Sequence, residues 1–221
     1  DRIRITGKCD YKKRGYRMTS SYDRQRNLNI HVPNSICVVG CGGVGSWVAI
    51  LLALVGVKRM ELWDGDIVEE TNLNRTLFSP RDVGRNKAQA LGEIILRLRP
   101  RIQLSINTRY LQPEDVKSLR AEVIVDGRDV FYPPLPNVRV SGGYNGKSLT
   151  LHLNPSYTGL EGATEEDAER RGYLIVPSYV VPPVLLASLF VGFICNPTTS
   201  EERISTFEVE DIINLLSRRL S

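Results

Sequence analysis

The segment Ser35-Ile-Cys-Val-Val-Gly-Cys-Gly-Gly-Val-Gly45 decides the fold of this chain. Its first five residues form a short apolar run with β-branched side chains, which is typical of a buried parallel strand. A glycine-rich turn, Gly40–Gly45, follows at once, and the apolar residues 46–57 fit a buried helix that ends at Gly56. Because residues 59–63 predict a second strand, the region is expected to be a strand-turn-helix-strand unit.

The same alternation continues outward from this unit. Residues 86–98 carry apolar side chains at the spacing of a helix with one buried face, and Pro100 ends that helix. This pattern predicts an α/β fold: a Rossmann-like, mostly parallel sheet with helices on both faces, plus additional C-terminal strands and an apolar helix. The remaining elements are expected as strands at 102–106, 121–126, 138–140 and 148–153, and a short helix at 113–119.

The chain is expected to consist of a basic N-terminal arm, residues 1–34, and a single domain, residues 35–221. The first 26 residues hold more Lys and Arg than Asp and Glu and lack apolar periodicity. Two interpretations of the arm stay open: a solvated segment, or a segment that reaches an anionic ligand or a partner subunit. Within the domain, residues 155–175 include a polar stretch, Thr164–Arg171, for which two interpretations stay open: a solvated helical turn or a mobile crossover segment.

Composition excludes several classes of protein. With 221 residues, 42% hydrophobic and 24% charged, the chain is expected to be globular and not disordered. A net charge of +4 is too small to indicate a nucleic-acid partner. Four scattered cysteines and no signal-peptide pattern predict a cytoplasmic, reducing location. Because the sequence begins at Asp1 and not at methionine, a preceding segment or partner domain stays open.

The uncharged run 172–200 is long enough to suggest a membrane span. Pro177, Pro182 and Pro183 interrupt it, which leaves residues 184–195 as continuous helix. Such a helix is only about 18 Å long, whereas a bilayer core is about 30 Å thick. We therefore expect no membrane contact and a helix in the core or at a dimer interface.

The turn Gly40–Gly45 satisfies the G-x-G-x-x-G pattern between a strand and a helix. Glycines let the backbone approach phosphates closely, and the following helix presents unpaired N–H groups to negative charge. Asp64, which lies about twenty positions further on at the end of the second strand, is the expected partner of a ribose hydroxyl. The pattern predicts nucleotide binding, although glycines that serve only close helix-sheet packing would look the same.

Five motifs together resemble the ThiF/MoeB/ubiquitin-activating-enzyme superfamily. They are Ser21-Tyr-Asp-Arg-Gln25, the glycine turn, Asp64-Gly-Asp-Ile-Val-Glu-Glu-Thr-Asn-Leu-Asn-Arg75, Asp82-Val-Gly-Arg-Asn-Lys87 and Asp126-Gly-Arg-Asp129. Members of this superfamily adenylate the C-terminal carboxylate of ubiquitin-like or sulfur-carrier proteins. The resemblance implies an ATP- and Mg²⁺-dependent adenylyltransferase that works as a homodimer on a small protein ending in Gly-Gly.

The resemblance also implies a role for individual residues. Arg24 would be an arginine finger that reaches the triphosphate of the neighbouring subunit, and Asp129 would hold Mg²⁺. Asp64 would bind the ribose, with Asp66 in the same nucleotide site. The ATP-binding turn and the surroundings of the phosphates would be formed by Gly40, Gly42, Gly43, Gly45, Asn72, Arg75 and Lys87.

The expected chemistry needs positive charge more than it needs a base. A carboxylate has the same sign as a triphosphate, so its attack on the α-phosphorus requires neutralisation and positioning. Arg75, Lys87, Mg²⁺ on Asp129 and a bidentate Arg24 would supply this. Each charge alone would also fit a solvated side chain, and Asp126 with Asp129 could simply cap a turn.

The cysteines depart from the family pattern. The chain has no Cys-x-x-Cys pair, so we expect no structural zinc. No cysteine lies between Pro155 and Tyr173, where an acyl-accepting thiol would be expected. Cys195 is expected to be structural and Cys41 to take no part in the chemistry. In addition, Val130 follows Asp129 where the family often has Asn. We expect an enzyme that stops at the acyl-adenylate or passes it to a nucleophile on a partner.

Two other functions stay open. The run Gly42-Gly-Val-Gly-Ser-Trp47 resembles the tRNA dehydratases that activate the carboxylate of threonylcarbamoyladenosine, and the basic arm could approach RNA. The Tyr-x-Arg-Gln element is more typical of the carrier-protein branch. The other function is that of a nucleotide-binding scaffold without catalysis. The sequence names neither the carrier nor the final acceptor.

Overall fold

The computed structural model describes residues 20–129, 135–156 and 177–218. Its strands form one seven-stranded sheet in the order β3-β2-β1-β4-β5-β6-β7. The first five strands in this order are parallel, and β6 and β7 are antiparallel to their neighbours. The strands are β1 (Ser35–Val39), β2 (Arg59–Trp63), β3 (Gln103–Asn107), β4 (Val123–Asp126), β5 (Val138–Tyr144), β6 (Ser148–Leu153) and β7 (Arg203–Glu208).

The helices are short, and each begins or ends at a residue suited to that place. α1 begins within the glycine turn and ends at Gly56, whose φ of 115° is left-handed and favours glycine. α2 begins after Asn86, whose side chain accepts a hydrogen bond from the Gln89 amide at 3.1 Å. The α-helices are α1 (Gly43–Val55), α2 (Lys87–Leu98), α3 (Pro113–Val116), α5 (Val181–Cys195) and α6 (Val209–Arg218). Single 3₁₀ turns lie at Glu70–Asn72 and Pro80–Asp82.

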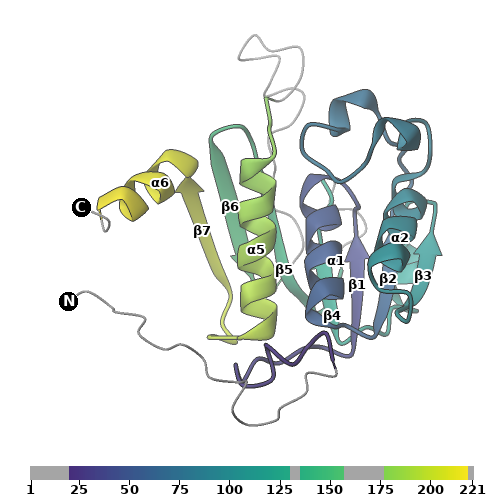
Figure 1. Cartoon of the computed structure of the whole chain (residues 1–221), viewed down its shortest axis with the longest axis horizontal. Helices are drawn as coiled ribbons and strands as arrows, with labels where there is room; N and C mark the ends of the chain where they lie inside the picture. Colours follow the sequence, from purple (N-terminus) through teal and green to yellow (C-terminus); the bar gives the residue numbers. More distant parts are fainter. Residues whose placement is uncertain (1–19, 130–134, 157–176, 219–221) are drawn as a thin grey trace, which may run out of the picture. The chain divides into compact units, whose positions relative to one another are not determined.

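Helices lie on both faces of the sheet, but unequally. α1, α2 and α5 cover one face, as Figure 1 shows. α3 adjoins the other face, where the side chains of a smaller core cluster meet. That cluster consists of Cys37, Val39, Trp63, Leu111, Leu119, Ile124, Leu135 and Val138. The predicted Rossmann-like fold, a mostly parallel sheet with helices, is therefore confirmed.

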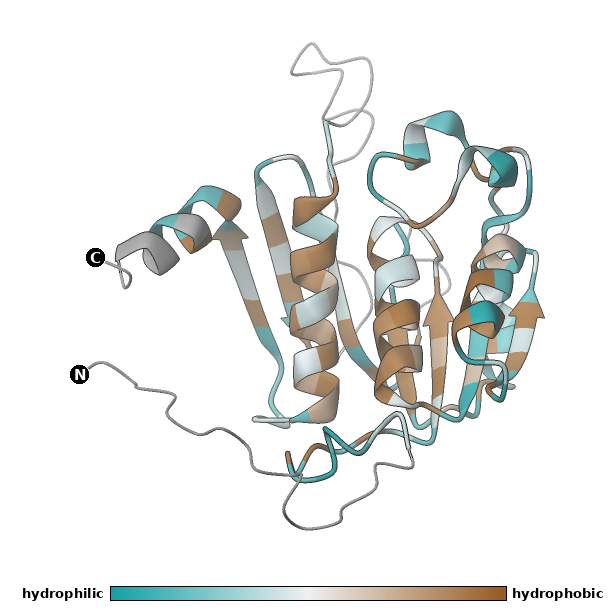
Figure 2. Cartoon of the chain, in the orientation of Figure 1, coloured by the Kyte–Doolittle hydropathy of each residue, from teal (hydrophilic) through white to brown (hydrophobic). Residues whose placement is uncertain are grey.

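α1 and α5 lie side by side and neither carries a charged side chain. Figure 2 shows hydrophobic residues over the later turns of α1 and over most of α5. Both helices carry fully buried side chains, among them Leu52 of α1 and Phe190 of α5. α5 lies against β5 and β6, so the apolar run of the sequence is used in the core. Among the described helices, none combines the length and hydrophobicity needed to cross a bilayer.

The chain divides between Ile30 and His31 into two units. The sheet and its helices belong to the second unit. In the first unit, the described residues 20–30 form a series of turns. The predicted crossover segment lies largely outside the described residues, as do most residues of the basic arm.

Strand positions agree closely with the sequence prediction for the central elements. The strands 35–39 and 59–63 have the expected bounds, whereas α1 begins at Gly43 and not at residue 46. α5 begins at Val181, earlier than expected, because Pro182 and Pro183 fall in the first turn, where a missing N–H costs nothing. β7 and α6 were not predicted. All residues of β7 are exposed, so its sequence lacks the alternation of apolar and polar residues that is typical of a half-buried strand.

Candidate functional site

The glycine turn lies at the carboxyl ends of β1 and β4, where α1 begins. Gly40 has φ of 90°, and a Cβ on it would lie 2.7 Å from the Gly127 carbonyl oxygen. A Cβ on Gly45 would lie 1.8 Å from the Gly40 carbonyl oxygen. These two glycines are therefore required by close packing of the backbone.

Gly42 and Gly43 differ from each other in their surroundings. In the described part of the chain, nothing lies within 4 Å of a Cβ built on Gly42, which lines a cavity. A Cβ on Gly43 would lie 1.9 Å from the Tyr144 hydroxyl. The packing interpretation thus holds for Gly40 and Gly45, and Gly42 leaves open backbone at the start of a helix, as a phosphate site needs.

Asp64 is buried at the end of β2 and is held by the backbone. Its Oδ2 accepts a hydrogen bond from the Cys41 amide at 2.6 Å, and its Oδ1 accepts one from the Asp66 amide at 2.8 Å. Burial raises the pKa of this carboxyl, while these hydrogen bonds lower it in part. The carboxylate therefore ties the glycine turn to the loop after β2.

A cavity of about 480 Å³ opens beside Asp64. It lies at the carboxyl ends of β1, β2 and β4, the edge where parallel α/β sheets bind ligands. Its lining combines apolar side chains, such as Val39 and Leu111, with charged ones, which suits a nucleoside with charged groups attached. The lining residues are Val39, Gly40, Gly42, Trp63, Asp64, Asp66, Lys87, Tyr110, Leu111, Gln112, Gly127, Arg128 and Asp129.

A smaller cavity of about 100 Å³ adjoins the larger one. The two share Gly42, Lys87, Gly127 and Asp129. The predicted phosphate residues therefore gather around one junction, although they come from separate loops. The smaller cavity is lined by Gly42, Gly43, Val44, Asn72, Arg75, Thr76, Lys87, Gly127, Asp129, Gly142, Gly143 and Tyr144.

Asn72 and Arg75 lie on a loop that is tied to α1. The Trp47 indole Nε1 donates a hydrogen bond to the Arg75 carbonyl oxygen at 2.9 Å. Asn72 is buried, and its Oδ1 accepts from the Glu69 amide at 3.1 Å. The Arg75 guanidinium donates to the Thr71 carbonyl oxygen, which holds the charge beside the smaller cavity.

Lys87 is the first residue of α2 and is paired. Its Nζ lies 2.9 Å from Asp66 Oδ2, and the other oxygen of Asp66 accepts a hydrogen bond from the Tyr110 hydroxyl. Partial burial would raise the pKa of Asp66, but the hydrogen bonds from Tyr110 and Lys87 outweigh it and the pKa is lowered. Asp66, predicted to contact the nucleotide, contacts Lys87 in this structure.

Asp126, the last residue of β4, and Asp129, three residues further on, differ in role. Asp126 is fully buried and accepts a forked pair of 2.8 Å hydrogen bonds from Nε and Nη2 of Arg128. The forked pair with Arg128 gives Asp126 a structural role. Asp129 instead faces both cavities. Burial raises the pKa of the Asp129 carboxyl, and Lys87 lowers it in part.

Asp129 fits the predicted magnesium site in its chemistry. Mg²⁺ is usually held by one or two carboxylates together with substrate phosphates, and Asp129 offers one carboxylate at the cavity junction. Within the residues that the structure describes, no group of three or more His, Cys, Asp or Glu side chains is gathered to hold a metal ion. Such a site would depend on nucleotide oxygens for its other ligands.

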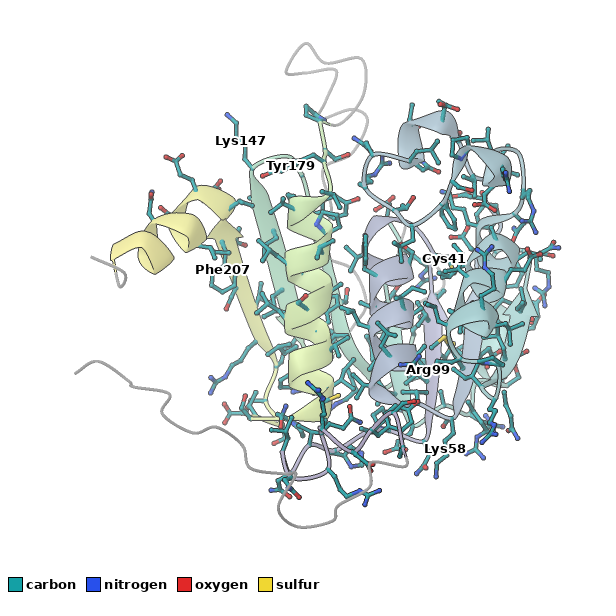
Figure 3. All side chains as sticks on the ribbon, in the orientation of Figure 1. Cys41, Lys58, Arg99, Lys147, Tyr179 and Phe207 are labelled. Carbon is teal, nitrogen blue, oxygen red and sulfur yellow. The ribbon has the colours of Figure 1, made fainter. Side chains whose placement is uncertain are left out.

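The other residues singled out in the sequence are Arg24 and the cysteines. Arg24 is in the turn segment of the first unit, and its role stays a prediction. The described cysteines Cys37, Cys41 and Cys195 are free and buried. Burial, then the charge of Asp64, raises the pKa of the Cys41 thiol, which opposes thiolate chemistry. Figure 3 shows Cys41 within the side chains of the fold.

A model of the ThiF family matches residues 21–132. The chain belongs to the ThiF family. The resemblance inferred from the motifs is thereby confirmed, and the matched range includes every predicted site residue from Arg24 to Asp129.

Relatives within the ThiF family carry different names. The chain is 34% identical over 113 residues to the tRNA threonylcarbamoyladenosine dehydratase of Escherichia coli, covering 49% of this chain and 42% of that protein. It is 36% identical over 195 residues to ubiquitin-like modifier-activating enzyme 5 of Arabidopsis thaliana, covering 77% and 41%. The chain thus spans less than half the length of these relatives. A crystal structure of PaaA shares the fold, with a TM-score of 0.60, 19% identity and coverage of 80% and 61%.

Sequence reasoning missed three residues at this ThiF-family site: Trp47, Tyr110 and Tyr144. Trp47 lies in an apolar helix, where the pattern predicts that a tryptophan belongs to the hydrophobic core. Tyr110 lies in a loop without a recognisable pattern. Tyr144 follows the pair Gly142-Gly143, and its hydroxyl reaches Gly43 from a different strand. Burial raises the pKa of Tyr144, while the neighbouring Arg75 lowers it.

Proposed function

We propose that this chain is an ATP-dependent adenylyltransferase that activates a carboxylate as an acyl-adenylate. The observation that carries the proposal is the junction of the two cavities, where Lys87 and Asp129 line both. The larger cavity has the size and the mixed lining that a nucleoside needs. The smaller cavity, with Arg75 and Asn72, suits phosphate or carboxylate groups.

The reaction would proceed by charge neutralisation. A carboxylate oxygen of the substrate attacks the α-phosphorus of ATP, a C–O–P linkage forms, the bond to the β-phosphate oxygen breaks, and pyrophosphate leaves. Because the attacking group is already ionised, the step needs no general base. Arg75 and Lys87 would offset the negative charge of both reactants. When bound, Mg²⁺ would screen the charge of the departing pyrophosphate.

Asp129 and Asp64 would have complementary roles in this chemistry. Asp129 faces the junction and would hold the metal ion there. Asp64 has both oxygens on backbone amides, yet a carboxylate can accept further hydrogen bonds, so it could also receive a ribose hydroxyl. Gly42 leaves the start of α1 open to phosphate oxygens.

The substrate that we propose is a small ubiquitin-like or sulfur-carrier protein that ends in Gly-Gly. The support is the extended similarity to ubiquitin-like modifier-activating enzyme 5, which covers 77% of this chain. A tRNA carrying threonylcarbamoyladenosine is a second candidate, supported by the 34% identity to the Escherichia coli dehydratase. We infer no thioester on the described cysteines, because Cys37, Cys41 and Cys195 are buried.

ATP-pyrophosphate exchange distinguishes these substrates. A panel of carrier proteins ending in Gly-Gly, their Gly-Gly-truncated controls and modified tRNA would be tested separately with the wild-type chain. Exchange that depends on an intact Gly-Gly terminus supports the carrier assignment. Exchange that depends on modified tRNA supports the second candidate. ATP binding without exchange across the panel would instead support a nucleotide-binding scaffold.

We further propose that the enzyme works as a homodimer in which Arg24 acts on the neighbouring subunit. Its support is the family resemblance together with exposed apolar side chains on two charge-free helices, Leu54 of α1 (38% exposed) and Leu189 of α5 (42%). Light scattering would give the mass in solution. Mixed dimers of Arg24→Ala and Asp129→Ala protomers should recover part of the exchange, and no recovery would contradict a shared site.

A further inference from the structure

Tyr110 lines the larger cavity and forms a hydrogen bond with Asp66. It lies in the loop between β3 and α3, and its side chain is 61% exposed. Its hydroxyl donates a hydrogen bond to Asp66 Oδ1, while Asp66 Oδ2 lies 2.9 Å from Lys87 Nζ. Asp66 therefore joins an exposed tyrosine to the ammonium group at the cavity junction.

The backbone around Asp66 and Lys87 is fixed independently of these side chains. The Lys87 amide donates to the Asp66 carbonyl oxygen at 2.9 Å. The Asn86 carboxamide donates to the carbonyl oxygens of Asp64 at 2.8 Å and Asp66 at 3.1 Å. What remains free to vary is the direction of the long Lys87 side chain, which its ion pair with Asp66 sets.

Tyr110 is not needed to hold its own loop. Leu111 is buried in the core cluster beneath the sheet. Arg109 pairs with Asp115 at 2.6 Å and lies 5.0 Å from the centre of the Trp63 ring. These neighbours anchor the loop on both sides of Tyr110, so loss of its hydroxyl would leave the loop in place.

Gly65 makes room for the tyrosine. A Cβ on Gly65 would lie 2.8 Å from atoms Cγ and Cδ2 of the Tyr110 ring, and 2.8 Å from its backbone nitrogen. Any side chain at Gly65 would displace Tyr110 from Asp66. Gly65 therefore leaves the space that the Tyr110 ring occupies, although the two residues lie far apart in the sequence.

We propose that Tyr110 is a positioning residue for Lys87. By holding one oxygen of Asp66, it keeps the other oxygen directed at Lys87 and so keeps the ammonium between the two cavities. This inference rests on the proposed function, because the ammonium is taken to meet phosphate oxygens there. Tyr110 acts through Asp66 and not by direct contact with the nucleotide.

The first test needs no nucleotide. Competitive reductive methylation followed by peptide mass spectrometry would measure how fast Lys87 is labelled, relative to Lys58 and Lys147, which are exposed and serve as internal references (Figure 3). An amine released from an ion pair is more reactive. Tyr110→Phe should therefore raise the relative labelling of Lys87 severalfold, and Asp66→Asn should raise it further.

Matched variants control this experiment. Tyr179→Phe removes the hydroxyl of another exposed tyrosine, at the segment before α5, and should leave Lys87 labelling unchanged. Gly65→Ala should reproduce the effect of Tyr110→Phe while the tyrosine is still present. Lys87 labelling in Tyr110→Phe equal to that of the wild type would overturn the proposal.

The second test asks whether Tyr110 acts through Lys87. Calorimetry would measure the ATP affinity of wild type, Tyr110→Phe, Lys87→Ala and the double variant. Tyr110→Phe should weaken ATP binding about fivefold, the effect of one modest hydrogen bond, and should have no effect in the Lys87→Ala background. Equal losses in both backgrounds would show direct contact with the nucleotide and overturn the proposal. A wild-type chain that binds no ATP would contradict the proposed function, while the labelling result would still decide the role of Tyr110.

Discussion

The Trp47 indole donates a 2.9 Å hydrogen bond to the Arg75 carbonyl oxygen, which joins α1 to the loop of the smaller cavity. Trp47→Phe keeps an aromatic ring and removes the donor. Without this bond the loop should hold Arg75 less firmly. The binding free energy for pyrophosphate should then fall by about 1 kcal/mol, which is about fivefold in apparent affinity. Exchange kinetics would show a raised KM, with the melting temperature as control. An unchanged KM in a folded variant would exclude this role of Trp47.

Alanine should destabilise the fold much more at Gly45 of the turn than at Gly42. A Cβ on Gly45 would lie 1.8 Å from the Gly40 carbonyl oxygen, whereas Gly42 has open space within the described residues. Gly45→Ala should lower the free energy of unfolding by about 2 kcal/mol or more. Gly42→Ala should cost less than about 1 kcal/mol and yet weaken ATP binding. Denaturant unfolding and calorimetry measure the two effects, and equal destabilisation by both variants would contradict the close-packing argument.

Glu122 should contribute stability that depends on pH. Its oxygens accept hydrogen bonds from the Asn34 amide and the His31 ring, each at 2.9 Å, and these bonds, Asn34 first, lower the pKa of Glu122 from 4.5. A carboxyl with a lowered pKa stabilises the fold above its unfolded pKa, and the stabilisation is lost as pH falls through the folded value.

Glu122→Gln tests this sign. The variant should lose about 1 kcal/mol near neutral pH and show a flatter decline of stability below about pH 4.5 than the wild type. Urea unfolding from pH 3 to 7 measures both, with the exposed Glu114→Gln as the matched control. A wild-type and a Glu122→Gln curve that run parallel down to the lowest pH would contradict the assignment.

The buried thiols should be unreactive and dispensable for adenylation. Burial raises the pKa of Cys37, Cys41 and Cys195. In the folded protein, peptide mass spectrometry after iodoacetamide treatment should find these three unmodified at pH 8, and modified once urea is added. Cys41→Ala should retain pyrophosphate exchange, because the Asp64 hydrogen bond uses the backbone amide at this position. A substrate thioester on Cys41 would contradict this account.

The central half of the fold could be predicted from the sequence because its signals are local. The apolar runs 35–39 and 59–63 and the helix stop at Gly56 are consecutive patterns, and the structure keeps them. β7 could not be predicted, because its residues are all exposed and pairing with β6 alone holds them in a strand. Such pairing is a long-range property that no short window contains.

The same contrast holds at the site. The family resemblance assigned Asn72, Arg75, Lys87 and Asp129 to one site, and all four line the smaller cavity. The pairings among neighbours could not be predicted, because Tyr110 meets Asp66 and Tyr144 meets Gly43 across separate loops and strands. Asp66 is a further example. It lines the larger cavity, and its contact with the nucleotide stays a prediction, but its motif gives no sign of its contacts with Lys87 and Tyr110.

The most direct test of the proposed function is ATP-pyrophosphate exchange by wild type and Asp129→Ala with the substrate that the panel identifies. Asp211→Ala, which removes a carboxylate from α6, is the matched control. Among the described residues, Asp129 is the one carboxylate that lines both cavities, together with Lys87, so its loss should remove exchange while the control retains it. Exchange in Asp129→Ala at the wild-type rate would contradict the assignment of this junction as the adenylation site.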